Sequence, residues 1–485
     1  MNESRYLVGI DLGTTNSALA YIDLEASADS DVAPAVHVLE IPQLDAPGAV
    51  GKRPLLPSFA FLPTRAERDK LDLSLPWAQQ RPYAVGHWAR TRGAERPGCL
   101  VSSAKSWLSH AGVNREAPIL PWQSNEEVDA ISPIEASARY LIHLREVFEQ
   151  HVLGGDAKAI QAHGLAETPV VLTIPASFDT VARELTLRAA AQAGLGNVTL
   201  IEEPQAAFYA WLQARGEAWR DDVAVGDVVL VCDIGGGTTD LTLIRVGDDA
   251  GDLTLERLAV GEHLLVGGDN MDLLLAHTVR GRLAEKGKSL DTSQFLALIR
   301  QCSAAKEELL AGTAERVAIS ILGSGSKLIG GTIKVELTRE DVESTLVDGF
   351  FPQATLQDRP TRGAKLGLRE VGLPYAHDAA ITRHLASFLG GASDARKAPV
   401  DPTAVLFNGG VMLAPRLRER VTTVLAEWFG DPRRVLSHAS LELAVAQGAV
   451  RYAYTRHVGK GVRIRGGVAQ TYYLGIQGAA PAVPG

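Results

Sequence analysis

Three features are scarce or absent in this sequence: cysteine, long apolar runs and an excess of basic residues. Its 485 residues include three cysteines, Cys99, Cys232 and Cys302, which are far apart and show no metal-ligand spacing. This spacing argues against a disulfide framework, and a reducing cytoplasm is the expected location. The apolar segments are short and interrupted, well below the roughly 20 residues that a membrane helix requires. Residues 2–4 are polar, so we expect a soluble chain without a signal peptide or a membrane partner.

The charge balance is acidic. The chain has 48 lysines and arginines against 57 aspartates and glutamates, a net charge of −9. A phosphate backbone or an anionic membrane attracts a basic face, so we expect no nucleic-acid partner. Hydrophobic residues make up 46% and charged residues 22%, which is ordinary for a globular protein, and the length suits two or more domains.

One pattern occurs twice along the chain: an apolar strand, an aspartate, a turn rich in glycine and threonine, and a returning strand. The first copy covers residues 6–22 around Asp11, and the second covers residues 228–246 around Asp233. Asp, Gly and Thr are common in hairpin turns, whereas Asp and Gly are rare inside strands. Two such signals indicate duplicated α/β lobes that face each other across a cleft.

The remainder alternates between strands and helices. Apolar spacing and capping residues predict helices over residues 137–152, 179–193, 205–214, 415–428 and 441–454, and strands over residues 170–174, 198–201 and 405–407. Residues 275–310 read as helical and residues 315–336 as β-rich. Two stretches read as insertions: a Pro-rich one of loops and short strands over residues 42–130, and a loop over residues 350–375.

The two turns carry residue types that hold phosphates and a hydrated cation. Mg²⁺ keeps several waters and is usually held by one or two carboxylates together with phosphate oxygens. Glycine lets backbone N–H groups approach phosphate oxygens, and threonine hydroxyls add donors. One such turn could be an ordinary hairpin, but two turns after apolar strands favour a phosphate-binding cleft.

A third glycine-rich stretch resembles a P-loop only superficially. It ends in Gly287-Lys288-Ser289, but five residues separate Gly281 from Gly287 where the motif requires four. The preceding segment also reads as a helix rather than a strand. We therefore assign this stretch no phosphate-binding role.

Longer stretches resemble the heat-shock protein 70 (DnaK-like) chaperone family. The family's two phosphate motifs are similar to YLVGIDLGTTNSALA and VCDIGGGTTDLTLI, and its adenosine motif is similar to VLFNGGVMLAPRL. The connecting stretches of the family resemble TIPASFDTVARELTLRAAAQAGL, LIEEPQAAFYAW and LLVGGDNMD. The similarity runs from the N-terminus to about residue 455.

The resemblance implies an α/β actin-like ATPase fold with ribonuclease H-like duplicated lobes around a central nucleotide cleft. Lobe I would cover residues 1–220, with its core in 1–41 and 165–220 and an inserted subdomain in 42–164. Lobe II would cover residues 221–460, with its core in 221–272 and 396–460 and an inserted subdomain in 273–395. Residues 461–485 would form a linker and the start of a truncated C-terminal region.

The resemblance also assigns roles to individual residues. Asp11 and Asp233 would hold Mg²⁺, largely through water, and K⁺ would flank it. Lys105 and Glu203 would orient the attacking water, and Pro175 and Arg183 would couple nucleotide state to a neighbouring domain. The other implied catalytic residues are Thr238 and Asp240. The implied nucleotide contacts, for ATP or ADP, are Gly13, Thr14, Thr15, Asn16, Gly235, Gly236, Gly237, Thr239, Gly267, Gly268, Lys306, Gly409 and Gly410.

Simpler structural roles are open for some of these residues. Lys105 alone would read as a surface lysine, Glu203 as a helix-capping acid and Pro175 as the end of a strand. The capping and catalytic roles of Glu203 are compatible with each other.

Three positions depart from the family pattern. Glu307 stands where the family has an arginine that stacks on adenine, and Ser303 stands at a glutamate position. Thr199 replaces a basic residue that J-domain partners use, so we do not expect the usual J-domain coupling. Residues 461–467 stand in place of the family's acidic, leucine-rich linker. Residues 472–476 resemble the first strand of a peptide-binding domain.

We therefore expect a slow, monomeric, cytoplasmic ATPase of a stress-response chaperone. Its further partners would be client polypeptides and a nucleotide exchange factor. Two alternatives share the hairpins: an actin-like filament-forming scaffold and a sugar or acid kinase. ATP-dependent polymer sedimentation would favour the scaffold, and ATP consumption stimulated by a hydroxylated substrate would favour the kinase.

Overall fold

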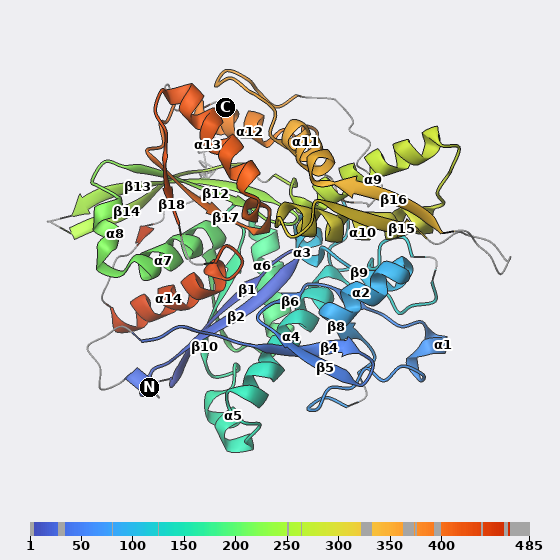
Figure 1. Ribbon diagram of the computed structural model, residues 1–485. Coiled ribbons are helices and arrows are strands. Elements are labelled where there is room, and N and C mark those ends of the chain that lie inside the picture. Colours follow the sequence, from blue (N-terminus) through green and yellow to red (C-terminus); the bar gives the residue numbers. More distant parts are fainter. Residues whose placement is uncertain are drawn as a thin grey trace, which may run out of the picture.

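Two mixed sheets, one in each half of the chain, organise the fold (Figure 1). The computed structural model describes residues 4–465 except 28–33, 80, 125, 250–251, 263, 322–331, 362–372, 374–375, 392–398, 438–439 and 460–463. The segment predicted to open a peptide-binding domain, residues 472–476, lies outside the described residues, as do most of residues 461–467 and much of the loop insertion over 350–375.

The first sheet has the order β11-β10-β1-β2-β3, and β6 pairs with β2. Its strands are β1 (Tyr6–Leu12), β2 (Asn16–Asp23), β3 (His37–Val38), β6 (Leu56–Pro57), β10 (Pro169–Ile174) and β11 (Asn197–Glu202). The second sheet has the order β18-β17-β12-β13-β14-β19. Its strands are β12 (Val228–Ile234), β13 (Thr239–Asp249), β14 (Asp252–Val260), β17 (Ala404–Asn408), β18 (Arg434–Leu436) and β19 (Ile464–Arg465).

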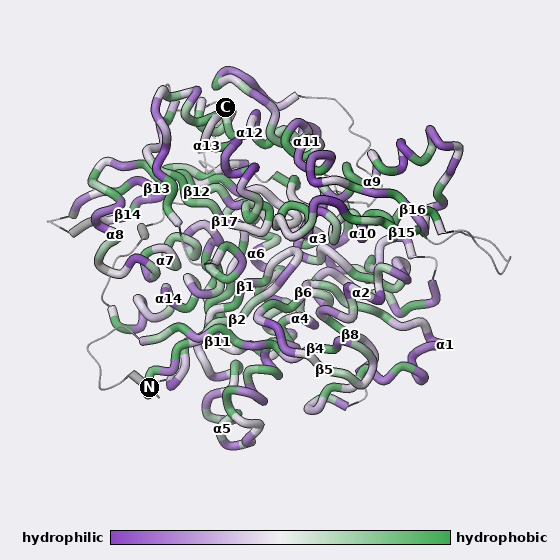
Figure 2. The backbone as a smooth tube through the Cα atoms, in the orientation of Figure 1, coloured by the Kyte–Doolittle hydropathy of each residue, from purple (hydrophilic) through white to green (hydrophobic). Residues whose placement is uncertain are grey.

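The two sheets share one arrangement of strands. β1 pairs antiparallel with β2 and parallel with β10, and β12 pairs antiparallel with β13 and parallel with β17. The recurrence that the sequence predicts is therefore confirmed at the level of the sheets. The central strands are apolar along their length (Figure 2), as expected for strands that are covered on both faces.

Two helices pack between the sheets: α7 (Glu203–Arg215) and α14 (Ala444–Val458). One buried cluster contains apolar side chains from β1 and β2, from both helices, and from β12 and β13. Gly448 allows the helices to approach closely, because a Cβ at this position would lie 1.7 Å from the carbonyl oxygen of Ala206. Gly9 of β1 also leaves no room for a side chain, since its Cβ would lie 2.5 Å from the carbonyl oxygen of Ala446.

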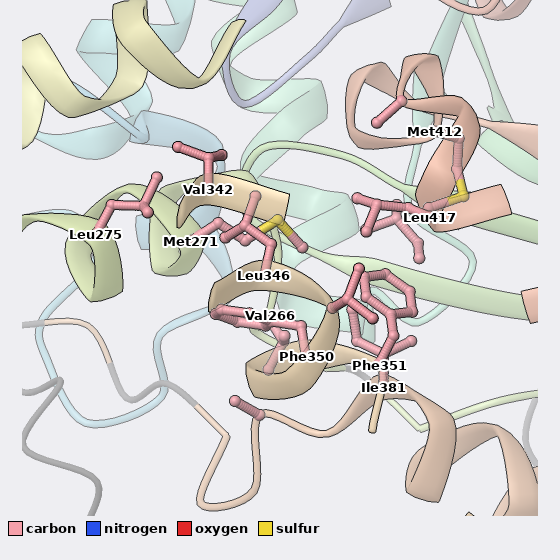
Figure 3. Packing of buried hydrophobic residues seen from close by; sticks show 14 of the residues in the cluster. Val266, Met271, Leu275, Val342, Leu346, Phe350, Phe351, Ile381, Met412 and Leu417 are labelled. Atoms are coloured by element: carbon pink, nitrogen blue, oxygen red, sulfur yellow. The ribbon is translucent and has the colours of Figure 1, made fainter. Parts of the chain in front are cut away.

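Helices also cover the outer face of each sheet. The first sheet is covered by α4 (Pro133–His151) and α6 (Thr180–Gln192). The second is covered by α9 (Gly268–Glu285), α10 (Thr292–Leu310), α11 (Arg339–Phe350), α12 (Ile381–Leu389) and α13 (Pro415–Phe429). Figure 3 shows Leu346 and Phe350 of α11 packed near Met271 of α9 in this second core. No helix within the described ranges has both the length and the apolar character needed to cross a bilayer.

The stretch over residues 42–130 contains more helix than the sequence predicts. The predicted short strands are β4 (Ile41–Ala46), β5 (Ala49–Arg53), β7 (Ala60–Phe61), β8 (Ala84–Val85) and β9 (Leu100–Val101). The structure adds helices α1 (Arg65–Arg68), α2 (His87–Glu95) and α3 (Ala104–Ser109), so the prediction of loops and strands alone was wrong. α2 gives little apolar periodicity because its buried residues are Trp88, Ala89 and Gly93.

Other boundaries follow the predictions closely. α6 begins after Asp179, whose side chain accepts from the backbone N–H of Ala182, and Gly194 follows the helix with φ 76°. β15 (Arg316–Ile321) and β16 (Ile333–Thr338) form the predicted β-rich pair. α9 contains Gly281, which confirms that the P-loop-like stretch follows a helix. The remaining helix is α5 (Ala157–His163).

Candidate functional site

A cavity of about 860 Å³ lies where the two hairpin turns meet. Its wall includes residues of β1 and β12, of the two turns, and of α2, α10 and α14. Most of the predicted site residues line it: Asp11, Gly13, Thr14, Thr15, Asn16, Lys105, Glu203, Asp233, Gly235, Gly236, Thr238, Gly268, Lys306, Gly409 and Gly410.

The two turns touch each other directly. A Cβ on Gly236 would lie 1.7 Å from Thr15 Oγ1, and one on Gly237 would lie 2.7 Å from Thr14 Cγ2. The chain at Gly267 packs on the second turn, since the backbone N–H of Gly268 donates to the carbonyl of Gly235 at 3.0 Å. Only glycine fits at these contacts, and the bare backbone leaves N–H groups near the cavity for an anion.

Asp11 and Asp233 occupy equivalent places, each near the end of a central strand. Asp11 accepts from the hydroxyl of Thr173 on β10 at 2.8 Å, and Asp233 accepts from the amide of Asn408 on β17 at 2.7 Å. In each case the donor comes from the parallel neighbour of the central strand. These two donors fix the orientation of the carboxylates. The sequence motifs do not identify the donors in advance.

A buried ion pair joins Lys105 of α3 to Glu203 at the start of α7. Burial alone would lower the pKa of Lys105, but Glu203 and Asp11 raise it above the ordinary value, so Lys105 stays charged. The alternative reading of Lys105 as a surface lysine is therefore wrong, because the residue is only 6% exposed. α3 is held against the second half by Ser103, whose hydroxyl donates to Asp269 at 2.8 Å.

Negative charge exceeds positive charge at the meeting point of the turns. Burial raises the pKa of Asp11 to about 6, and burial together with Glu203 raises the pKa of Asp233 well above its ordinary range. Burial also raises the pKa values of Glu203 and Asp240. Lys105 is the cation that these carboxylates share, so a divalent cation at Asp11 and Asp233 would relieve the repulsion.

The oxygen-only character of this group fits a hydrated Mg²⁺. Within the described residues, no three His, Cys, Asp or Glu side chains gather closely enough to form a protein-only metal cage. Mg²⁺ usually retains waters and takes further ligands from phosphate oxygens, so two carboxylates suffice.

The raised pKa of Asp11 predicts a pH-dependent stability of the nucleotide-free chain. The folded pKa is about 6 against an ordinary 3.8, so the folded state holds this proton more tightly than the unfolded state. The contribution of Asp11 to the free energy of unfolding therefore falls as pH rises from about 4 to about 6. We expect Asp11→Asn to be more stable than wild type at neutral pH by about 1 to 3 kcal/mol.

Urea unfolding without nucleotide or divalent cation, repeated across this pH range, measures the effect. The stabilisation by Asp11→Asn should shrink as pH falls toward roughly 4, where the carboxyl of the wild type is protonated. A pH-independent difference between the two proteins would contradict the assignment.

At the other end of the cavity, Lys306 of α10 pairs with Asp272 at 2.7 Å and donates to the carbonyl of Gly268 at 3.1 Å. Gly409 has φ 85°, and a Cβ there would lie 2.3 Å from the carbonyl oxygen of Ile234. The glycine at this position is thus required by packing on β12. Around Gly410 the space is open.

Glu307, which stands in place of the family's adenine-stacking arginine, forms an ion pair across the cavity. Its carboxylate accepts from Arg90 of α2 at 2.9 Å, and the two residues are 217 positions apart in the sequence. The guanidinium of Arg90 lies over the ring of Phe59, and so does that of Arg300. Arg90 therefore brings a guanidinium from the first half of the chain to this end of the cavity, in addition to Arg300 from the second half. The sequence gives no signal for it, because α2 was not predicted.

Several predicted residues lie behind the wall instead of in it. Thr239 is fully buried and donates its hydroxyl to the carbonyl of Val266 at 2.8 Å, so it stabilises the start of β13. Asp240 accepts from the hydroxyl of Ser177 at 2.5 Å. Arg183 donates to Glu202 at 2.9 Å. The others outside the wall are Pro175, Gly237 and Gly267.

The sheets and the cavity define a mixed α/β protein with a pocket suited to a phosphorylated ligand. A family model described as "Hsp70 protein" matches residues 87–357, which is more than half of the chain. The chain belongs to the Hsp70 family. The family implies the actin-like ATPase fold, in agreement with the mixed sheets.

Several relatives are chaperone proteins named HscA. The one from Citrobacter koseri is 27% identical over 436 residues, which cover 89% of this chain and 55% of the relative. The one from Salmonella paratyphi C is 27% identical over 450 residues, covering 92% and 58%. The one from Enterobacter sp. strain 638 is 31% identical over 289 residues, covering 58% and 38%. The chain thus spans about half the length of the curated relatives it matches.

Proposed function

We propose that this chain binds and slowly hydrolyses ATP, and that its nucleotide state controls a client-binding region in an Hsp70-type chaperone. The observation that carries the proposal is the buried Lys105–Glu203 pair between Asp11 and Asp233, where two glycine-rich turns meet. Phosphoryl transfer depends mainly on positioning and on neutralising charge, and this arrangement supplies both.

Each group of residues in the cavity has a distinct role in this proposal. The turns at Gly13–Thr15 and Gly235–Thr238 would hold the β- and γ-phosphates, and the charged Lys105 would stabilise negative charge that develops on the transferring group. Glu203 would orient the attacking water, with Asp240 as its neighbour. When bound at Asp11 and Asp233, Mg²⁺ would neutralise phosphate charge, and K⁺ would flank it.

The proposal includes the finer architecture of two lobes, each with an inserted subdomain, around the nucleotide. Residues 1–220 would form lobe I and residues 221–460 lobe II, each with one of the two mixed sheets as its core. Closure of the lobes around ATP or ADP would provide two states, which suits a timing switch. Residues 461–485 would lead toward the client-binding region.

Calorimetry tests the proposal directly. ATP, ADP and GTP are titrated into the full chain with and without Mg²⁺ and K⁺, and phosphate release is followed in parallel. We expect ATP binding that Mg²⁺ strengthens, followed by hydrolysis of less than about one ATP per second, well below typical enzyme turnover. Absence of ATP binding, or stimulation of turnover by a small hydroxylated substrate, would overturn it.

Partners belong to the same proposal. Client polypeptides and a nucleotide exchange factor are the expected partners. Thr199, in place of a basic residue, argues against the usual J-domain coupling. A cytoplasmic location and a monomeric state are expected as well.

We expect Glu307→Arg to tighten ATP binding. The substitution would place a second guanidinium near the base, where stacking on an aromatic ring contributes about 1 kcal/mol, a several-fold change in Kd. It also removes the Arg90–Glu307 pair, which is partly exposed and therefore weak. Calorimetry with ATP and with a ribose triphosphate that lacks a base measures the effect.

Glu308→Arg on the same helix is the matched control. Glu308 is exposed and lies outside the cavity wall. An equal gain from both substitutions, or a gain for the triphosphate that lacks a base, would show a general charge effect instead of base stacking.

A further inference from the structure

Behind the cavity, the carboxylate of Glu202 lies between two guanidinium groups from different halves of the chain. Arg183 of α6 donates to Oε1 of Glu202 at 2.9 Å, and Arg257 of β14 donates to Oε2. The side chains of Glu202 and Arg257 are only 9% and 7% exposed, whereas that of Arg183 is 31% exposed. The bridge is largely withdrawn from water, so solvent screens it less than a surface ion pair.

Glu202 immediately precedes Glu203, the partner of Lys105. Glu202 ends β11 in an extended conformation with φ −78° and ψ 137°, and Glu203 is the first residue of α7. One carboxylate therefore lies in the bridge and the other lies at Lys105. A single planar peptide unit connects the two residues, so a shift of one is transmitted to the other.

The same arginine on α6 also holds the loop that follows β10. Arg183 donates to the carbonyl of Phe178 at 3.1 Å, and Ser177 of this loop donates to Asp240 of β13 at 2.5 Å. Two strands of the second sheet, β13 and β14, thus contact the first half at neighbouring points. The contact of β13 involves Asp240 itself, and the contact of β14 lies one residue before Glu203.

We propose that Arg257 and Glu202 are positioning residues for hydrolysis. Their bridge between the two halves holds the β11–α7 junction, and the junction sets Glu203 against Lys105. Neither Arg257 nor Glu202 lines the cavity, so the bridge acts on the hydrolytic step and leaves nucleotide affinity unchanged. This inference rests on the proposed ATPase function.

The experiment compares single-turnover ATP hydrolysis with the calorimetric Kd for ATP in the full chain. Arg257→Met should slow hydrolysis roughly tenfold and leave the Kd within about twofold, because the lost interaction acts on positioning only. Arg257→Lys, which keeps the charge, should recover most of the rate. The matched control is Arg81→Met, since Arg81 is equally buried and pairs with Glu146 in the first half.

Removal of Arg257 leaves Glu202 partly unpaired and buried, which destabilises the fold. The double variant Glu202→Gln/Arg257→Met removes that charge and repeats the same test if the single variant fails to fold. Slow hydrolysis at unchanged Kd, restored by Arg257→Lys and absent in Arg81→Met, supports the proposal.

Two results would overturn it. One is a wild-type hydrolysis rate in a folded variant without the bridge. The other is a parallel loss of affinity and rate, which would mark a structural role alone. A wild-type chain that binds ATP but does not hydrolyse it would refute the proposed function instead, and this result is obtained before any variant is compared.

Discussion

Lys105→Ala is expected to abolish hydrolysis of ATP while sparing its binding. Lys105 is buried, stays charged and pairs with Glu203, so its loss removes the charge that stabilises the transferring phosphoryl group. Loss of a preorganised charge of this kind lowers kcat by roughly 10² to 10⁴. Binding should change far less, because the two glycine-rich turns and the other end of the cavity remain.

The loss of Lys105 also changes the protonation of Glu203, which slows hydrolysis further. Lys105 lowers the pKa of Glu203 against the burial that raises it, so the alanine variant would favour the protonated form of Glu203. A protonated Glu203 is a poor acceptor for the attacking water. Single-turnover hydrolysis and ATP calorimetry on the same preparation separate the two steps.

Lys288→Ala is the control for this prediction. Lys288 is exposed and belongs to the P-loop-like stretch to which we assign no phosphate-binding role. Its substitution should leave both binding and hydrolysis unchanged. Near-normal turnover in folded Lys105→Ala would refute the catalytic role of Lys105, and loss of hydrolysis in Lys288→Ala would restore the P-loop reading.

The parts of the fold that the sequence predicted correctly are those with local signals. The hairpins around Asp11 and Asp233 were found because their strands are apolar and their turns rich in glycine. The start of α6 was found because Asp179 caps it. By contrast, α3 carries Lys105 in a stretch that reads as irregular, and only the family resemblance identified that lysine.

The contacts that orient the site were harder to predict, because they form between segments far apart in sequence. Thr173 and Asn408 reach the two aspartates through the register of parallel strands. Arg257 meets Glu202 only because β14 of the second sheet lies next to the end of β11. A single sequence has no period or motif that reports such pairs.

The site is symmetric in its two aspartates but not in its lysine and glutamate, and this difference suits the proposed hydrolysis of ATP. Asp11 with Thr173, and Asp233 with Asn408, are the same arrangement built twice, whereas Lys105 and Glu203 occur once and come from the first half. A symmetric pair of carboxylates suits a cation shared between the halves. Because the Lys105–Glu203 pair comes from one half alone, it gives the cavity one direction, as attack on a terminal phosphate requires.

The largest effect on stability is expected at Gly448, where α14 crosses α7. A Cβ on Gly448 would lie 1.7 Å from the carbonyl oxygen of Ala206 and 2.5 Å from its carbonyl carbon, so the added methyl meets backbone that has no room to yield. The helices would have to separate, and the buried cluster between the two sheets would open. We expect Gly448→Ala to lower the free energy of unfolding by about 3 kcal/mol or more, despite the better helix propensity of alanine.

Gly281→Ala is the matched control, since Gly281 lies inside α9 and its Cβ would meet nothing within 4 Å. There the same change should stabilise the chain by up to about 1 kcal/mol through helix propensity alone. Chemical unfolding of both variants against wild type gives the comparison, and destabilisation of equal size would contradict the packing explanation. Because α7 begins at Glu203, a displaced α7 also moves Glu203 away from Lys105, so any Gly448→Ala protein that still folds should hydrolyse ATP more slowly than the Gly281→Ala protein.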